Sequence, residues 1–353
     1  MREPRPFPTA VLAAGLAVVL LGALIVRLFV LDERSSGPPA ARSSPAPLPA
    51  TTPPPSPSTS PSPSPAVERG SLVIHGAGDT NVDPNYIPNF QRYGYAWAWT
   101  GLHGLFKRDD LTVVNLECAV SNLGSAVPKE FNFRGDPAAL PAMRKAGVDV
   151  ANMANNHSYD FGPTALVDTR ENLIDSGIAP VGAGKDQKEA LKPARFEVKG
   201  WKIAVVGFDE VVDPFPTAVA TATKPGTAAG HDFDAMVAAV RGAKKRADFV
   251  IVDIHWGVEL DTQPRSSDVA LGHRLVDAGA RIIFGGHSHR LQPLEIYRGA
   301  AIFYSLGNFV WPMHSVAGST TAVAEVRISP GGRLRARLLP AFIEASGRPV
   351  LRD

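Results

Sequence analysis

The sequence predicts an α/β domain with mixed sheets, preceded by an apolar N-terminal helix and an extended stalk. Three observations carry this prediction. Short apolar, β-branched runs recur after residue 70, helix-period segments ending in glycine lie between several of them, and the preceding region is crowded with proline. Strands that alternate with helices form layered α/β domains. The 353 residues suffice for one large domain or two small ones.

Residues 1–8 are predicted to be a cytoplasmic tail, and residues 9–31 a transmembrane signal anchor. The apolar run is long enough for a helix to cross roughly 30 Å of hydrocarbon. Its one charge, Arg27, lies near the helix end, from where the side chain can reach the membrane interface. Arg2 and Arg5 precede the run, which favours a cytoplasmic N-terminus. The expected location is therefore the cell membrane, with a single span and the C-terminal domain outside the cell.

Residues 32–69 are predicted to be a disordered linker rich in proline and serine. The part from 37 to 66 consists almost wholly of Pro, Ser, Thr and Ala. Such a segment buries too little apolar area to fold, and proline keeps it extended at about 3.1 Å per residue. A cleaved signal peptide is the alternative to an anchor, with PPAAR at 38–42 as its candidate cleavage site.

Residues 70–353 are predicted to be the folded domain. The predicted strands are 72–77, 111–116, 148–153, 202–208, 249–254, 281–286 and 301–306. The predicted helices are 137–147, 165–177 and 269–279, each ending in glycine. The segments 321–328 and 334–342 read as strands with no helix between them, which predicts a mixed sheet system.

Composition excludes some classes of partner and site. The net charge of +2 gives no reason to expect nucleic acid. Cys118 is the only cysteine, so neither an intrachain disulfide nor a cysteine-rich zinc site can form.

Polar side chains that can bind a metal follow five of the predicted strands. They are Asp79, Glu117, Asn156 with His157, His255, and the pair His287 and His289 in the stretch GGHSH. In open α/β sheets, ligands bind at the carboxyl ends of the strands. Carboxylate, amide and imidazole without thiolate suit divalent manganese, zinc or iron. The His-x-His pair allows one ligand to each of two ions about 3.5–4 Å apart, so one or two ions are expected.

Six short motifs occur in a fixed order between residues 71 and 310. They are GDxN (Asp79 to Asn81), NLE (Asn115 to Glu117), NNHxxDxG (Asn155 to Gly162), HWGxE (His255 to Glu259), GGHSH and SLGNF (Ser305 to Phe309). Together they resemble the CapA or PgsA family of capsule and poly-γ-glutamate synthesis proteins, which is similar in fold to the calcineurin-like metallophosphoesterases. The resemblance implies a four-layer sandwich of two mixed β-sheets flanked by helices.

The resemblance also implies a role for each of these residues. Ligands of the first metal would be Asp79 and His289, those of the second Asn156, His255 and His287, and Glu117 would bridge the two. His157 would donate a proton to the leaving group. A divalent ion would lower the pKa of water to roughly 7 and so supply the nucleophile.

One position departs from the phosphoesterase pattern. Those enzymes begin with Asp-x-His, whereas the residue two after Asp79 is Asn81. Asparagine offers only a neutral carbonyl oxygen, so the first metal would lose an imidazole. The capsule family generally lacks this histidine.

Four further residues are considered beside the predicted ligands. Three of them have both a functional and a structural interpretation, and the fourth has a structural one. Arg134 is expected to contact substrate or to form a surface ion pair, since its planar guanidinium suits phosphate and carboxylate. Glu259 would orient a metal ligand by hydrogen bonding to it, or it would stand at the start of a helix. Asp160 would support a site residue or cap the helix of 163–176, with the cap slightly favoured. Asn155 is expected to satisfy loop backbone groups.

Three functions follow from these observations. The first is a membrane-anchored, outward-facing protein of capsule or poly-γ-glutamate synthesis, with a metal-dependent phosphoesterase-like site acting on an anionic surface polymer or its precursor. The second is a non-catalytic scaffold or binding subunit of a membrane synthesis or export complex, which Asn81 favours. The third is a secreted metal-dependent hydrolase.

Overall fold

The computed structural model describes residues 68–211, 218–228 and 230–352, all within one compact unit, Pro65–Asp353. The predicted cytoplasmic tail and membrane anchor, and all but the last two residues of the predicted linker, lie outside the described residues. Within the described residues, no helix combines the length and the apolar character that a membrane span requires.

The larger of the two main sheets is mixed. Its order is β18 (Pro349–Leu351), β17 (Leu334–Ile343), β16 (Thr320–Ile328), β1 (Leu72–Thr80), β2 (Leu111–Leu116), β5 (Val150–Asn152) and β6 (Ala179–Val181), and β15 (Asn308–Val310) pairs with the end of β1. Strands β1, β2, β5 and β6 run parallel, whereas β16, β17 and β18 are antiparallel.

The second main sheet has a parallel centre and antiparallel edges. Its order is β13 (Leu294–Tyr297), β14 (Ala300–Phe303), β12 (Ala280–Gly286), β11 (Phe249–His255), β9 (Trp201–Asp209) and β8 (Ala194–Val198). Two small pairs complete the strands: β3 (Ala119–Val120) with β4 (Arg134–Gly135), and β7 (Ala183–Gly184) with β10 (Gly226–Thr227).

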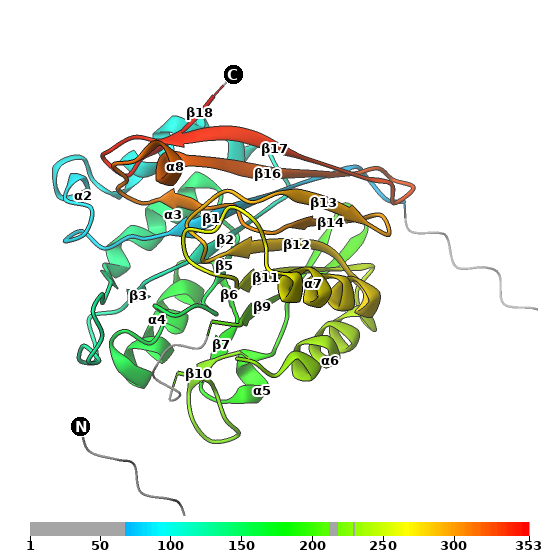
Figure 1. The fold of residues 1–353 in the computed structure, drawn as a ribbon, viewed down its shortest axis with the longest axis horizontal. Helices are drawn as coiled ribbons and strands as arrows, with labels where there is room; N and C mark the ends of the chain where they lie inside the picture. Colours follow the sequence, from blue (N-terminus) through cyan, green and yellow to red (C-terminus); the bar gives the residue numbers. More distant parts are fainter. Residues whose placement is uncertain (1–67, 212–217, 229, 353) are drawn as a thin grey trace, which may run out of the picture. The chain divides into compact units, whose positions relative to one another are not determined.

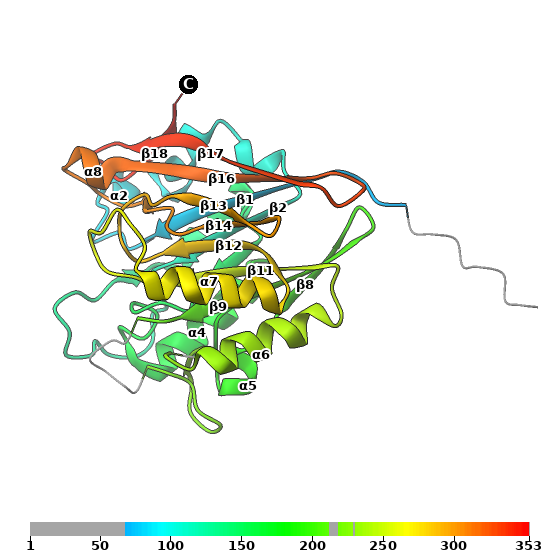
Figure 2. The same cartoon turned by 45° about the vertical axis from the view of Figure 1, so that its right-hand side comes forward.

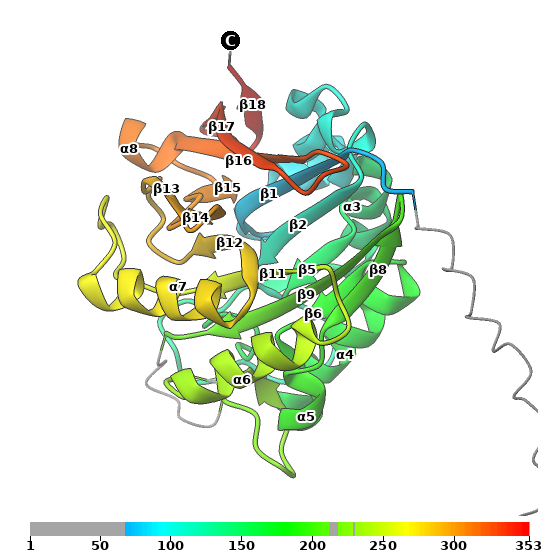
Figure 3. The same ribbon diagram turned by 90° about the vertical axis from the view of Figure 1, so that its right-hand side faces the viewer.

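Helices cover the outer faces of both main sheets (Figure 1). The α-helices are α2 (Asn89–Tyr93), α3 (Leu140–Ala146), α4 (Gly162–Asp175), α5 (Gln187–Ala190), α6 (Phe233–Lys244), α7 (Ser266–Ala278) and α8 (Val316–Ser319), and the 3₁₀ helices are η1 (Tyr95–Leu102), η2 (Leu105–Lys107) and η3 (Pro137–Ala139). Helices α6 and α7 lie side by side over β9, β11 and β12, as Figures 2 and 3 show. Helices α3 and α4 pack against the outer face of the larger sheet.

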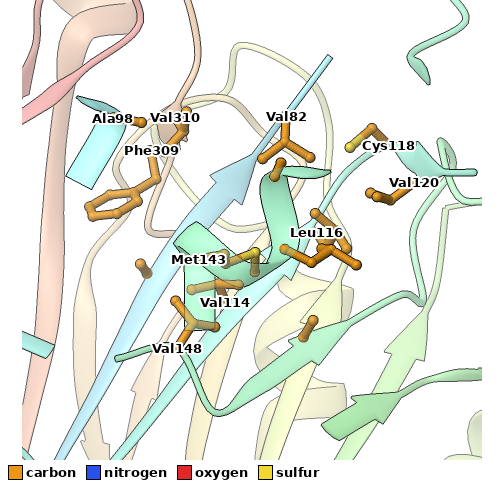
Figure 4. Close-up of a cluster of buried hydrophobic side chains, with 14 of the residues drawn as sticks. Val82, Ala98, Val114, Leu116, Cys118, Val120, Met143, Val148, Phe309 and Val310 are labelled. Atoms are coloured by element: carbon orange, nitrogen blue, oxygen red, sulfur yellow. The ribbon is translucent and has the colours of Figure 1, made fainter. Parts of the chain in front are cut away.

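Three apolar clusters separate these layers. Between the sheets, Ile74 and Val113 of one pack with Ile251 and Phe284 of the other. The outer cluster of the larger sheet includes Val114, Met143 of α3 and Phe309 (Figure 4). The third joins α6 and α7 to the second sheet. Each such side chain contributes about 1.5–3 kcal/mol on burial, so the strands are held by their apolar faces.

The predicted α/β class with mixed sheets is confirmed. Each predicted strand overlaps an observed one, although the strand predicted at 148–153 shortens to β5, Val150–Asn152, and the one predicted at 301–306 shortens to β14, Ala300–Phe303. The helix predicted at 165–177 begins earlier, at Gly162, because Pro163 suits the first turn. Short strands such as β8, β13 and β15 were not predicted, since their runs are too brief to show a period.

Candidate metal centre

The candidate site lies where the carboxyl ends of the two main sheets meet. Asp79 is the penultimate residue of β1, and Glu117 follows β2 directly, with its N–H donating to the carbonyl of Thr80 at 2.9 Å. From the other sheet, His255 ends β11, and β12 leads directly into the GGHSH turn. Parallel strands bring their ends to one edge, which places these side chains together.

Asp79, Glu117 and His255 form the centre of the site. Each offers a ligand atom, and these atoms all lie within 4.8 Å of one another. His289 joins them, because its Nδ1 lies 3.3 Å from Asp79 Oδ2 and its Nε2 lies 3.9 Å from Glu117 Oε1. A shared ion would be within reach of Asp79, Glu117 and His255, and His289 lies beside the two carboxylates.

Asn156 and His287 complete the group. The Oδ1 atom of Asn156 lies 2.9 Å from His255 Nε2. The ring of His287 lies 4.8 Å from that of His255 between centroids, and its backbone N–H donates to Asp79 Oδ2 at 3.2 Å. The structure therefore brings all six predicted ligands into one cluster of side chains. Their role as ligands stays a prediction.

The GGHSH turn has local features that explain its residues. A Cβ on Gly286 would lie 2.5 Å from Asp79 Oδ1, so only glycine allows this carboxylate to approach the strand. His287 and His289 both adopt left-handed backbone conformations, with φ of 86° and 52°. Such strained residues cluster at functional sites, where the turn aims the side chains.

The buried acids and histidines of the site include atoms that have no hydrogen-bond partner in the described part of the chain. Asp79 and Glu117 are fully buried, and Glu117 Oε1 and His287 Nδ1 have no hydrogen-bond partner among the described residues. Burial raises the pKa of the Glu117 carboxyl well above its usual range, and the charge of Asp79 raises it further. An isolated buried carboxylate is costly, and a divalent cation between the two acids would remove this cost.

Two of the three histidines favour the neutral form that binds metals. Burial lowers the pKa of His255 well below its usual value, and it lowers that of His287 to about 3. At His289 burial acts in the same direction, but the hydrogen bond and charge of Asp79 outweigh it and raise the pKa. Neutral imidazole is the ligand form.

Comparison with known proteins identifies the family. The family model described as bacterial capsule synthesis protein PGA_cap matches residues 72–313. The chain belongs to the PGA_cap family. It is 33% identical to the PGA biosynthesis protein CapA of Bacillus subtilis over 70% of this chain and 66% of that protein. It is 31% identical to the capsule biosynthesis protein CapA of Bacillus anthracis over 80% of this chain and 70% of that protein.

A solved structure shares the fold of this PGA_cap protein. It is a putative 5'-nucleotidase from Staphylococcus aureus in complex with alpha-ketoglutarate, with a TM-score of 0.51 and 14% sequence identity. The match covers 78% of this chain and 55% of that protein. At this identity the likeness concerns the fold alone.

His157 of the PGA_cap domain has a carboxylate partner. Its Nδ1 lies 2.8 Å from Asp160 Oδ2, and the same oxygen accepts the N–H of Phe133 at 2.8 Å. The other oxygen of Asp160 lies 2.9 Å from Lys129 Nζ. The predicted helix cap is therefore wrong: α4 has Phe161 at its N-cap and no side-chain cap, because Asp160 supports His157 instead.

Two asparagines in the quoted motifs organise the site without having been predicted to do so. Asn115 Nδ2 lies 2.8 Å from Asp79 Oδ1 and 3.2 Å from His255 Nδ1. Asn308 Oδ1 lies 2.8 Å from His289 Nδ1. Both positions were visible within NLE and SLGNF. Lys129 had no such signal, because it approaches the site from a loop outside every motif.

Asn155 and Asn81 serve the backbone. Asn155 donates to the carbonyl of Leu116 at 2.8 Å and accepts the N–H of His157 at 3.1 Å, which confirms its expected role. The Oδ1 atom of Asn81 accepts the N–H of Asp83 at 2.8 Å. The one oxygen that Asn81 could offer a metal is thus already engaged.

Arg134 and Glu259 form no hydrogen bond or ion pair with the six clustered side chains, although the charge of Glu259 helps to raise the pKa of Glu117. The Arg134 guanidinium donates to the carbonyls of Ser121, Leu123 and Gly124, and lies 3.7 Å from the ring centroid of Phe161. It forms no ion pair among the described residues, which favours a loop-fastening role over either predicted one. Glu259 is exposed and lies before α7 rather than at its start, so the helix-start interpretation is wrong.

Proposed function

We propose that this PGA_cap protein takes part in surface-polymer synthesis as a metal-dependent hydrolase or transferase, cleaving a phosphoester or amide link in an anionic polymer or its precursor. The observation that carries the proposal is the cluster of Asp79, Glu117 and His255 from both sheets, whose ligand atoms lie within 4.8 Å of one another and in which Glu117 Oε1 has no hydrogen-bond partner among the described residues. The family membership supports the biological context, and the donor set supports one or two ions of manganese, zinc or iron.

The residues that would hold the ion are Asp79, Glu117, His255 and their neighbours Asn156, His287 and His289. Bound there, a divalent ion supplies Lewis-acid activation of a phosphoryl or carbonyl oxygen and of the attacking water. The two carboxylates already lie within 4.8 Å of His255, so the site needs little rearrangement.

His157 is the residue that would move a proton. Its Nδ1 faces Asp160, which fixes the ring and leaves Nε2 available to protonate a leaving group. Burial lowers the pKa of His157, and Asp160 opposes this shift. Lys129 and the N–H of Phe133 hold Asp160 in turn, so the proton donor is positioned by two loops.

A chromogenic phosphodiester assay tests the proposal. The full chain, loaded with manganese or zinc, is expected to turn the substrate over, and His157→Ala and His255→Ala are expected to abolish turnover. His314→Ala is the control, because His314 is exposed and has no described contact with the site. Elemental mass spectrometry should find the metal in wild type and less of it in His255→Ala. Turnover that persists in both site variants would contradict the proposal.

The second candidate is a non-catalytic binding subunit of a synthesis or export complex. The engagement of Asn81 by the Asp83 N–H favours it, because the first metal then lacks a ligand. Full metal loading without turnover under manganese, zinc or iron would support this candidate over the enzyme.

The N-terminal anchor and an extracytoplasmic location form part of the proposal. Its support is the apolar run of 9–31 with arginines before it and the proline-rich linker after it. Expected partners are membrane subunits of the synthesis machinery. Membrane fractionation and N-terminal sequencing test this: a mature chain beginning near residue 42 in the medium would support a secreted hydrolase instead. Deleting the gene should alter the surface polymer.

A further inference from the structure

Four arginines gather on one face of the β16–β17 hairpin, far from the metal centre. This arginine row consists of Arg327 on β16, Arg335 and Arg337 on β17, and Arg333 in the turn before β17. Alternate residues of a strand point to the same face, so Arg333, Arg335 and Arg337 follow one another at roughly 7 Å intervals. Their neighbours Leu334, Ala336 and Leu338 pack into the core between the sheets, which fixes the arginines on the outer face.

The row carries excess positive charge. Glu325 is its one acid: it accepts from Arg327 at 2.9 Å and from Arg337 at 2.7 Å. Arg333 and Arg335 are exposed, and no described residue forms an ion pair or a hydrogen bond with the guanidinium group of either. Four cations and one anion leave a formal charge of +3 on this face.

Two of the arginines lie directly opposite each other. Arg327 and Arg335 are register partners across the antiparallel pair. Like charges in this position destabilise a sheet, so folding gives no reason for the arrangement. An anionic ligand that sits between the strands would turn this repulsion into attraction.

The surface around the row is hollowed into two adjoining grooves. One, of about 410 Å³, is lined by the segment 71–73 and by Arg327, Arg333 and Arg335. The other, of about 420 Å³, is lined by Glu325 and by Arg327, Arg335 and Arg337. Arg327 and Arg335 line both grooves, so the two grooves adjoin at these side chains.

We propose that the arginine row is a docking track for a linear polycarboxylate. Guanidinium groups pair with carboxylates through two parallel hydrogen bonds, and a repeat of roughly 7 Å presents them to successive anionic groups of one extended chain. A bilayer fits less well, because no exposed large apolar side chain of the described residues lies on β16 or β17.

The arginine row would bind the polymer at a distance from the metal centre. Arg327 pairs in register with Val73, six residues before Asp79 along β1, which is roughly 20 Å. The inference rests on the proposed function in that the polymer held here would be the one processed or handed on at the metal centre. The two proposals can be refuted independently, because the arginine row and the metal centre share no residue.

Fluorescence anisotropy with labelled poly-γ-glutamate tests the track. The full chain, purified in mild detergent, is expected to bind the polymer, and the affinity should fall as salt rises from 50 to 200 mM. The double variant Arg333→Gln, Arg335→Gln should bind at least tenfold more weakly. Its melting temperature should stay the same or rise, because it removes the repulsion between Arg327 and Arg335.

The matched control removes two cations elsewhere. Arg241→Gln with Lys245→Gln changes the net charge equally on α6, where both residues are exposed, and should bind like wild type. Three outcomes would overturn the proposed track. Both double variants could lose polymer affinity equally, the wild type could fail to bind the polymer, or it could bind phosphatidylglycerol vesicles but not the polymer. His255→Ala should retain polymer binding, and the track variant should retain metal, which separates this test from that of the proposed function.

Discussion

The Nδ1 atom of His157 lies 2.8 Å from Oδ2 of Asp160, a carboxylate that is 1% exposed. Asp160 also pairs with Lys129 and accepts the N–H of Phe133. One carboxylate therefore connects the loop after β5 to the loop before β4, and it orients the His157 imidazole.

Asp160→Asn is expected to destabilise the fold and to disturb His157. The amide loses the charge that Lys129 requires and places an N–H against a donor. We expect the free energy of unfolding, measured by urea denaturation, to fall by about 2–4 kcal/mol. Asp175→Asn, at an exposed position on α4, is the control and should change it by less than about 0.5 kcal/mol. Equal stability of Asp160→Asn and wild type would show that the network contributes nothing.

Metal removal is expected to lower the melting temperature of the full chain. An ion at one hundred times its dissociation constant adds about 2.7 kcal/mol of stability, and chelation removes it. Differential scanning fluorimetry with manganese, then with EDTA, measures the shift. Glu117→Gln should lose the shift, because the variant gives up the carboxylate whose Oε1 has no hydrogen-bond partner among the described residues. His314→Ala should keep it; a shift that Glu117→Gln also keeps would place the ion elsewhere.

Gly286→Ala is expected to impair the site through one methyl group. The added Cβ would lie 2.5 Å from Asp79 Oδ1 and 3.4 Å from His255 Nδ1, so the carboxylate must move. We expect about tenfold weaker manganese binding by calorimetry and a loss of about 1–3 kcal/mol in unfolding free energy. Gly331→Ala serves as control, since its Cβ would meet nothing within 4 Å. Unchanged manganese affinity would mean that Asp79 is not a ligand.

Glu325 predicts a pH dependence of stability. Hydrogen bonds from Arg327, and then from Arg337, lower the pKa of its carboxyl to about 2, from 4.5. A lowered folded-state pKa adds stability that is complete above pH 4.5 and is lost as the pH falls toward 2. Because both arginines are more than half exposed, we expect only about 1–2 kcal/mol.

The measurement compares wild type with Glu325→Gln by urea denaturation between pH 3 and 7. The two curves should differ most at pH 7 and converge toward pH 3. Glu197→Gln, at an exposed position of β8, is the control. A difference that grows on acidification would reverse the sign and refute the assignment.

Much of the architecture was predictable because its signals are local. The apolar β-branched runs gave β1, β2, β9, β11 and β12 nearly to their ends. Donors directly after those runs, such as His255, could be expected at one edge because parallel strands end together. Asn115 and Asn308 lay within visible motifs, but no local rule says that an asparagine faces a histidine across the pocket.

Wrong predictions of side-chain roles arose where a polar side chain had more than one possible hydrogen-bond partner. Asp160 precedes a helix and reads as a cap, yet its carboxylate bonds Phe133, which lies 27 positions earlier in the chain. Arg134 forms no ion pair among the described residues and donates to three loop carbonyls instead, while its contact with substrate stays a prediction. Such choices depend on distances between segments that composition and spacing do not encode.

The sequence alone determined which residue types stand at the strand ends, and with them the family. Tertiary structure alone decided which of these groups lack a hydrogen-bond partner among the described residues, as at Glu117 Oε1, and that Arg327 lies opposite Arg335 across the β16–β17 pair. The physical reason is that strand formation follows from local apolar patterns. The partner of a polar side chain is instead settled only when distant segments pack together and exclude water.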